Sequence, residues 1–294
     1  MNVNTFLALA LACAVLPALA ADQSIEPGKK FTYKQSAGAP QELEVYFPPN
    51  WKAGGPKVPG VLLFHGGAWA GGDLSMLRPQ CAYFASRGLV AITANYRMLT
   101  RGEGKKSDAG VLENKRVCTT DAKSAIRWAK QHSDELGLDP QRLIVGGGSA
   151  GGHIAVLATT NPGLNDPQDA KDLDTSVAAY VLFNPALSGK DSVDPEVDAL
   201  KHLTVKFAPA IMFYGTKDSW KIGGDDACKL LKKLGNATTE MWTAEGQGHS
   251  FFNKQPWLDL TIAAADKFLV GRGLMKGSGT LAPPAGGEKL VKAP

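Results

Sequence analysis

The sequence has few of the residues that build metal centres. It contains four cysteines and five histidines among 294 residues, and no group of them has the short spacing of a metal-binding motif. It also has no Gly-rich phosphate loop of the Walker type and no internal repeat. These absences exclude the common zinc modules, P-loop nucleotide enzymes and solenoid proteins. We therefore expect neither a metal nor a cofactor.

The chain also carries little net charge. Its 32 Lys and Arg residues and 28 Asp and Glu residues give a formal charge of +4, and its basic residues are not interleaved with aromatic ones. This pattern predicts no nucleic-acid partner. Hydrophobic residues make up 44% of the chain and charged residues 20%, which is typical of a globular protein with a buried core. α/β chains of this length often form a single domain.

A long apolar run occurs at the N-terminus. Residues 6–16 are apolar, and Ala18-Leu19-Ala20 has the small-x-small pattern of a cleavage site. The alternative, a membrane anchor, needs about 20 apolar residues, and Pro17 interrupts this run. We therefore expect residues 1–20 to be a signal peptide, the mature protein to be secreted or periplasmic, and no membrane partner.

What the sequence does contain is a motif for nucleophilic catalysis. Gly147-Gly148-Ser149-Ala150-Gly151 directly follows the apolar run Leu143-Ile144-Val145. Gly-x-Ser-x-Gly between a buried strand and a helix is typical of a nucleophile elbow, a tight turn that presents the serine hydroxyl at the top of a sheet. Ser149 is therefore the candidate nucleophile. For the motif alone, a Gly-rich turn without catalytic function is the alternative.

A second motif lies upstream, where such a site needs donors for an oxyanion. The apolar run 61–64 predicts a strand, and His65-Gly66-Gly67-Ala68-Trp69 follows it. Backbone N–H groups of such a loop, and of the residue after the nucleophile, bind the oxyanion in esterases with this arrangement. Trp69 either forms a wall of an acyl pocket or fastens the loop to the core. The candidate donors are Gly66, Gly67, Ala68 and Ala150.

The base is expected after the nucleophile and after the acid. His65 and His132 precede Ser149, and His153 lies on the helix that follows it, where a histidine more often packs. His249 lies in a Gly-flanked loop after the strand-like segment 238–243, whereas His202 lacks such a context. His249 is therefore the candidate base.

Asp218 is the candidate acid. It follows the strand-like segment 208–215 and precedes His249 by 31 positions, which leaves room for a helix and a strand between them. Asp225 and Asp226 are the rivals. Because they follow Gly223-Gly224, we expect them at the N-terminus of a helix, where carboxylates interact favourably with the helix dipole.

Strand-like and helical segments alternate along the chain, which predicts an α/β fold with a mostly parallel, doubly wound sheet and helices on both faces. After an antiparallel hairpin, the three candidate catalytic residues fall at the carboxyl ends of strands, where ligands bind in such sheets. A loop is expected over 98–115, and no large cap domain is expected. The expected strands are 30–35, 42–47, 58–65, 89–95, 143–146, 177–184, 209–215 and 239–244, and the expected helices are 76–87, 118–136, 150–160, 226–234 and 257–270.

These motifs resemble those of secreted α/β-hydrolase esterases, above all the BD-FAE and acetyl-esterase-like group, which is related to the hormone-sensitive-lipase family. The resemblance includes residues 121–128 and 136–142 and covers about residues 40–270. Gly148 stands where hormone-sensitive-lipase relatives usually have Asp, which favours the esterase branch. Ala68 replaces the last Gly of their His-Gly-Gly-Gly motif, and a backbone donor survives that change.

The resemblance implies a serine carboxylesterase that hydrolyses short-chain, acetyl-type esters by a Ser-His-Asp acyl-enzyme mechanism. The substrate would be a small-molecule or carbohydrate ester, and the oligomeric state stays open. The alternatives are a prolyl-oligopeptidase-type serine peptidase, a feruloyl esterase or polyester hydrolase, and a binding module without activity. Residues 21–275 would form the catalytic domain, and the Gly-, Pro- and Ala-rich tail 276–294 is expected to be disordered.

Three cysteines remain after the signal peptide, so at most one disulfide forms within the chain. Cys81 lies in the expected helix after the Gly-Gly loop, and Cys118 begins the expected helix before the elbow strand. We expect a Cys81–Cys118 disulfide, with buried reduced thiols as the alternative. Cys228 would then be a free thiol.

Overall fold

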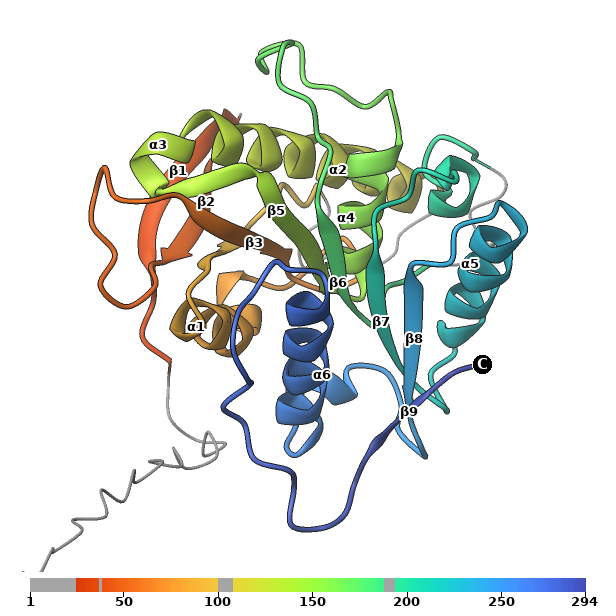
Figure 1. Cartoon of the computed structure of the whole chain (residues 1–294). Helices are drawn as coiled ribbons and strands as arrows, with labels where there is room; N and C mark the ends of the chain where they lie inside the picture. Colours follow the sequence, from red (N-terminus) through yellow and green to blue (C-terminus); the bar gives the residue numbers. More distant parts are fainter. Residues whose placement is uncertain (1–24, 37–38, 100–107, 188–193) are drawn as a thin grey trace, which may run out of the picture.

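The computed structural model describes residues 25–36, 39–99, 108–187 and 194–294. Within these ranges the chain forms one nine-stranded sheet with helices packed on both faces (Figure 1). The predicted signal peptide, residues 1–20, lies outside the described residues. None of the helices in the described part of the chain combines the length and the apolar character needed to cross a membrane.

The sheet has the order β1-β2-β4-β3-β5-β6-β7-β8-β9. The strands from β4 to β8 run parallel to their neighbours, whereas β1, β2 and β9 pair antiparallel. The expectation of a mostly parallel, doubly wound sheet that opens with a hairpin is confirmed. The strands are β1 (Lys29–Ser36), β2 (Ala39–Tyr46), β3 (Val58–Phe64), β4 (Val90–Ala94), β5 (Leu138–Gly148), β6 (Ala179–Phe183), β7 (Ala210–Gly215), β8 (Thr239–Ala244) and β9 (Leu290–Lys292).

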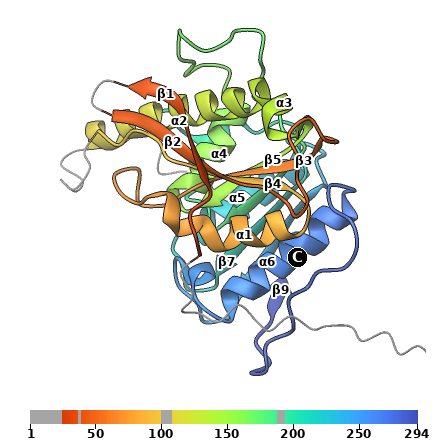
Figure 2. The same cartoon turned by 90° about the vertical axis from the view of Figure 1, so that its left-hand side faces the viewer.

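The helices divide between the two faces of the sheet. Helices α1 and α6 cover one face, and α2, α4 and α5 cover the other (Figure 2). The α-helices are α1 (Arg78–Ser86), α2 (Asp108–Gln131), α3 (Ser133–Leu136), α4 (Ala150–Thr160), α5 (Lys221–Lys233) and α6 (Trp257–Gly271). Short 3-10 turns are η1 (Leu74–Leu77), η3 (Ala199–His202) and η4 (Phe251–Asn253).

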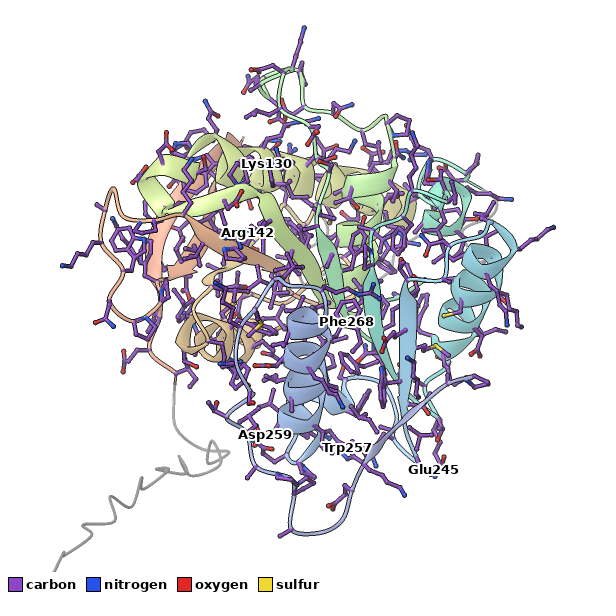
Figure 3. The ribbon with its side chains drawn as sticks, in the orientation of Figure 1. Lys130, Arg142, Glu245, Trp257, Asp259 and Phe268 are labelled. Carbon is purple, nitrogen blue, oxygen red and sulfur yellow. The ribbon has the colours of Figure 1, made fainter. Side chains whose placement is uncertain are left out.

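Strand β3 shows why both faces are covered. Its side chains alternate, so that Leu62 and Phe64 belong to the core on the α2 and α4 side, whereas Val61 and Leu63 belong to the core on the α1 and α6 side. All four side chains are completely buried. A strand that is apolar on both faces fits a parallel sheet between two helical layers. Phe268 of α6, labelled in Figure 3, belongs to the same core as Val61 and Leu63.

The expected Cys81–Cys118 disulfide is wrong. Both thiols are free and buried. Cys81, on α1, packs in the same core as Val61, and Cys118, on α2, packs in the core on the opposite side of the sheet. The sheet lies between them and prevents the close approach that a disulfide requires.

Two further expectations are corrected at the ends of elements. Helix α2 begins at Asp108, so part of the segment 98–115 is helical rather than a loop. Val111 and Leu112 in this N-terminal extension pack against the core and account for it. The tail 276–294 is not disordered throughout, because β9 extends the sheet beyond β8 and Leu290 packs against the core. A short strand with apolar residues suffices to cover an edge that β8 would otherwise expose.

The described residues form no large cap over the carboxyl edge of the sheet. Within the described residues, the helical structure in the connection from β6 to β7 is limited to the short 3-10 helix η3, and η1 follows β3. The loops after β3, β5, β6, β7 and β8 therefore meet at this edge and remain accessible. This edge holds the candidate residues.

Candidate active site

Ser149 lies in a strained turn between β5 and α4. Its φ and ψ angles are 52° and −118°, an arrangement that costs a residue with a side chain about 1–3 kcal/mol. The flanking glycines make the turn possible, because a Cβ on Gly147 or Gly151 would lie 2.2 Å or 1.9 Å from the carbonyl oxygen of Phe64. The Ser149 N–H donates to the carbonyl of Phe183 at 2.9 Å, which fixes the turn on β6.

The structure brings the three candidate catalytic side chains together. Nε2 of His249 lies 2.7 Å from Oγ of Ser149, and Nδ1 of His249 lies 2.9 Å from Oδ2 of Asp218. The Asp218 side chain is completely buried, and the His249 side chain is 32% exposed. Because the carboxylate accepts a hydrogen bond from Nδ1–H, Nε2 is left as an acceptor for the Ser149 hydroxyl. The arrangement is able to move a proton from the hydroxyl to the ring.

The acid is held by its own loop. The second oxygen of Asp218 accepts a hydrogen bond from the backbone N–H of Trp220 at 2.9 Å. The loops of the acid and the base are also joined, because the N–H of Lys217 donates to the carbonyl of Gln247 at 2.9 Å. The carboxylate therefore has a fixed position relative to the imidazole ring of His249.

The rival carboxylates lie elsewhere, although not where the sequence predicted. Helix α5 begins at Lys221, so Asp225 and Asp226 lie in its second turn rather than at its N-terminus. Asp225 pairs with Lys221 at 2.9 Å. The Gly pair that suggested a helix start lies inside the helix. A Cβ on Gly224 would lie 2.3 Å from the ring of Tyr214 on β7. Close packing of α5 on the sheet requires that glycine.

The loop after β3 has an unusual backbone. Gly67, Ala68 and Trp69 have φ angles of 122°, 53° and 62° in succession. A Cβ on Gly66 would lie 3.2 Å from Cβ of Ser149, so the loop passes directly beside the candidate nucleophile. Ala150 is at the first position of α4, where backbone N–H groups have no partner within the helix. The candidate oxyanion donors thus surround Ser149.

His65 supports this loop from the protein interior, a role that the sequence analysis did not assign. It is completely buried. Its Nε2 lies 3.0 Å from Oδ1 of Asn95, its Nδ1 lies 2.8 Å from the carbonyl oxygen of Gly66, and its ring stacks on Tyr96 at 4.3 Å. The sequence signal was its position directly before the Gly-Gly pair.

Trp69 both lines the cavity and fastens the loop. Its Nε1–H donates to Nδ1 of His153 at 3.2 Å, and the ammonium group of Lys115 lies 4.3 Å from the centre of its ring. Trp220 meets it edge-to-face at 6.2 Å. The cavity beside Ser149 has a volume of about 350 Å³. Its lining includes Gly66, Gly67, Ala68, Trp69, Met76, Leu77, Ala186, Trp220, His249 and Phe252.

Asn184 is a member of the site that the sequence analysis missed. It follows β6, it is completely buried, and its Nδ2 lies 3.2 Å and 3.3 Å from the two ring nitrogens of His249. Its Oδ1 accepts from the N–H of Ser250 at 3.3 Å. The one signal in the sequence was an asparagine at the end of an expected strand, which is too common to identify a site.

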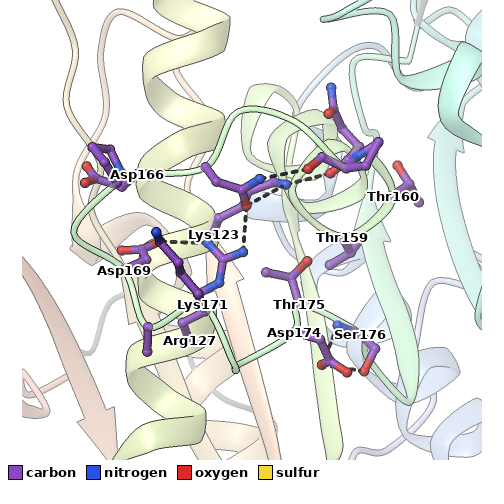
Figure 4. A pocket seen from close by; sticks show the side chains of 15 residues that line it. Lys123, Arg127, Thr159, Thr160, Asp166, Asp169, Lys171, Asp174, Thr175 and Ser176 are labelled. Atoms are coloured by element: carbon purple, nitrogen blue, oxygen red, sulfur yellow. Dashed lines mark hydrogen bonds and ion pairs between the residues drawn. The ribbon is translucent and has the colours of Figure 1, made fainter.

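A second cavity, of about 610 Å³, lies between α2 and the loop after α4 (Figure 4). Two of its basic side chains already have hydrogen-bond partners. Lys123 donates to the carbonyls of Asn161 and Gly163, and Arg127 donates to Asp169 and Asn165. It lies at the C-terminal end of α4, whereas Ser149 lies at the N-terminal end. The described residues hold no group of three or more His, Cys, Asp or Glu side chains arranged for a metal ion.

Comparison with known proteins relates this chain and its fold to ester hydrolases. A family model described as BD-FAE matches residues 43–242. A curated protein from Mycobacterium tuberculosis, named probable carboxylic ester hydrolase LipM, is 31% identical over 150 residues, which cover 50% of this chain and 32% of that protein. The chain therefore spans about a third of the length of this relative.

Solved structures cover more of the chain. A native thermophilic esterase, Est2, from Thermogutta terrifontis matches with a TM-score of 0.78 and 32% identity, covering 87% of this chain and 96% of that chain. A butyrate-bound structure of the same esterase matches with a TM-score of 0.77 and 33% identity, covering 86% and 98%. The similarity thus extends over nearly all of that esterase.

Proposed function

Because the chain belongs to the BD-FAE family and has an α/β-hydrolase fold with no large cap in its described residues, we propose that it is a serine carboxylesterase. The observation that carries this proposal is the chain of two short hydrogen bonds from Asp218 through His249 to Ser149. The relatives named as ester hydrolases support the reaction class.

In the proposed reaction, Ser149 attacks an ester carbonyl while Nε2 of His249 takes the hydroxyl proton. Asp218 keeps the proton of the ring on Nδ1 and stabilises the positive charge that the ring acquires. His249 then gives the proton to the leaving alcohol. Water, activated by the same ring, releases the acid from the acyl-enzyme and restores Ser149.

The negative charge that develops on the carbonyl oxygen needs donors that are already in place. We assign this role to backbone N–H groups of Gly67, Ala68 and Ala150, with Gly66 as the start of the loop. The left-handed backbone of Ala68 and its proximity to Ser149 support the assignment. Loss of one such donor typically lowers the rate about 10²–10³-fold.

The acyl part of the substrate is proposed to be short. The cavity of about 350 Å³ is bounded by Trp69 and by Phe252, both nearly completely buried, so neither is free to move aside without disturbing the core. The likeness to an esterase that binds butyrate is in line with a short acyl group. Acetyl-type esters are therefore the proposed substrates.

The alcohol part has more room. Met76 and Asn253 line the cavity beside Ser149 and also a neighbouring cavity of about 300 Å³. Met76 is 37% exposed, so it lies at an open boundary between the two. A bulky alcohol such as a sugar unit has space to extend there, and we propose acetylated carbohydrate as the substrate class. Acetate release from acetylated xylan tests this assignment, and methyl ferulate is the competing substrate.

We also propose that the mature protein is exported. This rests on the apolar run and the small-x-small pattern of residues 1–20. Mass spectrometry of the exported protein tests it, because cleavage after Ala20 would make Ala21 the first residue. An intact N-terminus in the cell membrane would contradict it.

The serine mechanism is tested with Ser149→Ala. We expect hydrolysis of p-nitrophenyl acetate to fall by at least about 10³-fold, because no other hydroxyl contacts Nε2 of His249 within the described residues. The fold should be retained, as judged by circular dichroism and thermal unfolding. Ser86→Ala, which removes a hydroxyl that bonds the carbonyl of Tyr83, is the matched control and should keep full activity. Substantial activity in Ser149→Ala would reject the mechanism.

A further inference from the structure

The amide of Asn184 lies over the face of the His249 ring. Its Nδ2 is 3.2 Å from Nδ1 and 3.3 Å from Nε2 of the ring. The in-plane directions of these nitrogens are already occupied, by Asp218 at 2.9 Å and by Ser149 at 2.7 Å. A third group that is equally close to both nitrogens therefore lies out of the ring plane.

The orientation of this amide is fixed from both sides. Oδ1 of Asn184 accepts the backbone N–H of Ser250 at 3.3 Å, so the NH₂ group faces the ring. The Asn184 backbone N–H donates to the carbonyl of Phe213 at 2.7 Å. Its φ of 37° is in the left-handed region, where asparagine is favoured over most residues with side chains. The side chain therefore links β6 to the loop that carries the candidate base.

We propose that Asn184 is a positioning residue that holds the imidazole of His249 between Asp218 and Ser149 and favours its neutral form. The proposal rests on the proposed role of His249 as the base. The ring is 32% exposed on a loop, and a contact on its face restricts its rotation and displacement. An N–H group interacts weakly with the π face of a neutral ring and is repelled by a protonated one.

The groups around the His249 ring allow the influence of the Asn184 amide on its protonation to be separated from the influence of neighbouring charges. The charged group that contacts it is the Asp218 carboxylate, from the loop after β7. Ser149 from the elbow after β5, and Trp220 and Phe252 on the walls of the same cavity, are uncharged. Loss of the Asn184 amide should therefore let the ring accept a proton more readily, under the unchanged influence of Asp218.

The experiment compares Asn184→Ala and Asn184→Asp with the wild type. We expect Asn184→Ala to lower kcat for p-nitrophenyl acetate about tenfold, because a displaced base transfers the proton less effectively. KM should change less than about twofold, because Asn184 is not among the residues that line the cavity beside Ser149. The acid limb of the pH–rate profile should move to higher pH by about half a unit, the size of a weak N–H contact with a ring face. Asn184→Asp should move it further, because a carboxylate favours the protonated ring.

Asn236 provides a matched control. It is a buried asparagine before β8, at the opposite edge of the sheet, and its amide donates to the carbonyls of Val205 and Phe207. Asn236→Ala removes a similar number of hydrogen bonds and should lower stability. It should leave the kcat and the acid limb of the profile unchanged.

A readout without substrate keeps this test distinct from the test of the proposed function. The Cε1–H resonance of His249, identified by its loss in His249→Ala, is followed by NMR against pH in each variant. Its titration should move to higher pH in Asn184→Ala and further in Asn184→Asp, whether or not the chosen ester is hydrolysed. The proposal is overturned if the titration does not move in Asn184→Ala, or if kcat in Asn184→Ala equals that of the wild type.

Discussion

At the scale of single residues, the site depends on backbone conformations that residues with side chains seldom adopt. Ala68, Trp69 and Ser149 have φ angles of 53°, 62° and 52°. Such conformations persist only where surrounding contacts enforce them. For Ser149 the enforcing contact is its N–H bond to Phe183, and for Trp69 it is the indole bond to His153. The strain aims a hydroxyl and backbone donors into the cavity rather than into the core.

Trp69 carries the first prediction at this scale. Trp69→Ala should raise the kcat/KM ratio of p-nitrophenyl octanoate to acetate at least about tenfold, because removal of the indole opens the wall beside Ser149 and each accommodated methylene contributes binding energy. Trp69→Phe keeps a ring there but loses the bond to His153. It should keep the acetate preference and unfold at a lower temperature.

The control for this prediction is Trp128→Ala. Trp128 is a partly buried tryptophan of α2 that packs on Phe31 and His132 instead of lining the cavity. It should leave the ratio of the two esters unchanged. An unchanged ratio in Trp69→Ala as well would mean that the acyl group lies against a different wall.

Single residues also show where sequence analysis works and where it does not. Ser149 and His249 could be proposed because each lies in a Gly-rich loop directly after an expected strand, a pattern that few residues share. Asn184 also follows a strand, but nothing in its neighbours distinguishes it. Its contact with His249 depends on the spacing of two loops, which only the folded chain defines.

At the scale of elements, α4 is held at both ends. Its N-terminus forms the elbow with Ser149, and its C-terminus is met by Lys123 of α2. The Lys123 ammonium group donates to the carbonyls of Asn161 and Gly163 at 2.6 Å and 2.5 Å. A cation at this end complements the helix dipole. Burial, together with the nearby Arg127 guanidinium, nevertheless lowers the pKa of Lys123 to about 8.

This pKa predicts how the stability of the protein depends on pH. In the unfolded chain the pKa of a lysine is about 10.4, so between pH 8 and pH 10 the unfolded state retains a proton that folded Lys123 has lost. Stability rises with pH where the unfolded state binds more protons. The free energy of unfolding of the wild type, relative to Lys123→Met, should therefore increase from pH 8 to pH 10, by at most about 3 kcal/mol.

Urea unfolding at pH 7.5 and pH 9.5 measures this difference. Lys229→Met is the control, because the Lys229 side chain is 78% exposed and its pairing with Asp226 is loose, at 3.7 Å. Its difference from the wild type should be the same at both pH values. A pH-independent difference for Lys123→Met would show that this lysine keeps its proton in the folded state.

Elements also differ in how well the sequence predicts them. Strand β8 and helix α4 could be located residue by residue, because β8 is followed by the polar, Gly-rich segment 245–249 and α4 begins directly after the elbow residue Ser149. Helix α5 begins earlier than predicted because Gly224 serves close packing on Tyr214 inside the helix and does not mark its start. Strand β9 could not be predicted, because three residues in a Gly- and Pro-rich tail become a strand only beside the open edge of β8.

At the scale of the whole molecule, the sheet separates two cores. Cys81 and Cys118 belong to different sides, and this is why their proximity could not be judged from the sequence. Alternation of strands and helices predicts a two-layered cover but does not say which helix covers which face. The expected disulfide was wrong because the sequence, although it predicts both helices, does not show that they cover opposite faces of the sheet.

The same separation allows a test of cooperativity. Both the Cys81 and the Cys118 thiols are buried, and burial raises the pKa of each, so we expect neither to react with an alkylating agent in the folded protein. If both helical layers unfold with the sheet as one unit, the two thiols should become reactive at the same free energy of opening. Cys228 is partly buried, with its pKa raised to about 11, and should react first.

Alkylation followed by mass spectrometry in increasing urea measures the opening free energy at each thiol. We expect the values for Cys81 and Cys118 to agree within about 1 kcal/mol, close to the uncertainty of linear extrapolation. Exposure of Cys118 at clearly lower urea would mean that the layer of α2 and α4 separates before the layer of α1 and α6. Ser149 would then lose its support before the protein unfolds, because α4 carries the elbow. Activity measured at the same urea concentrations distinguishes these outcomes, since in a single cooperative unit activity and both thiols change together.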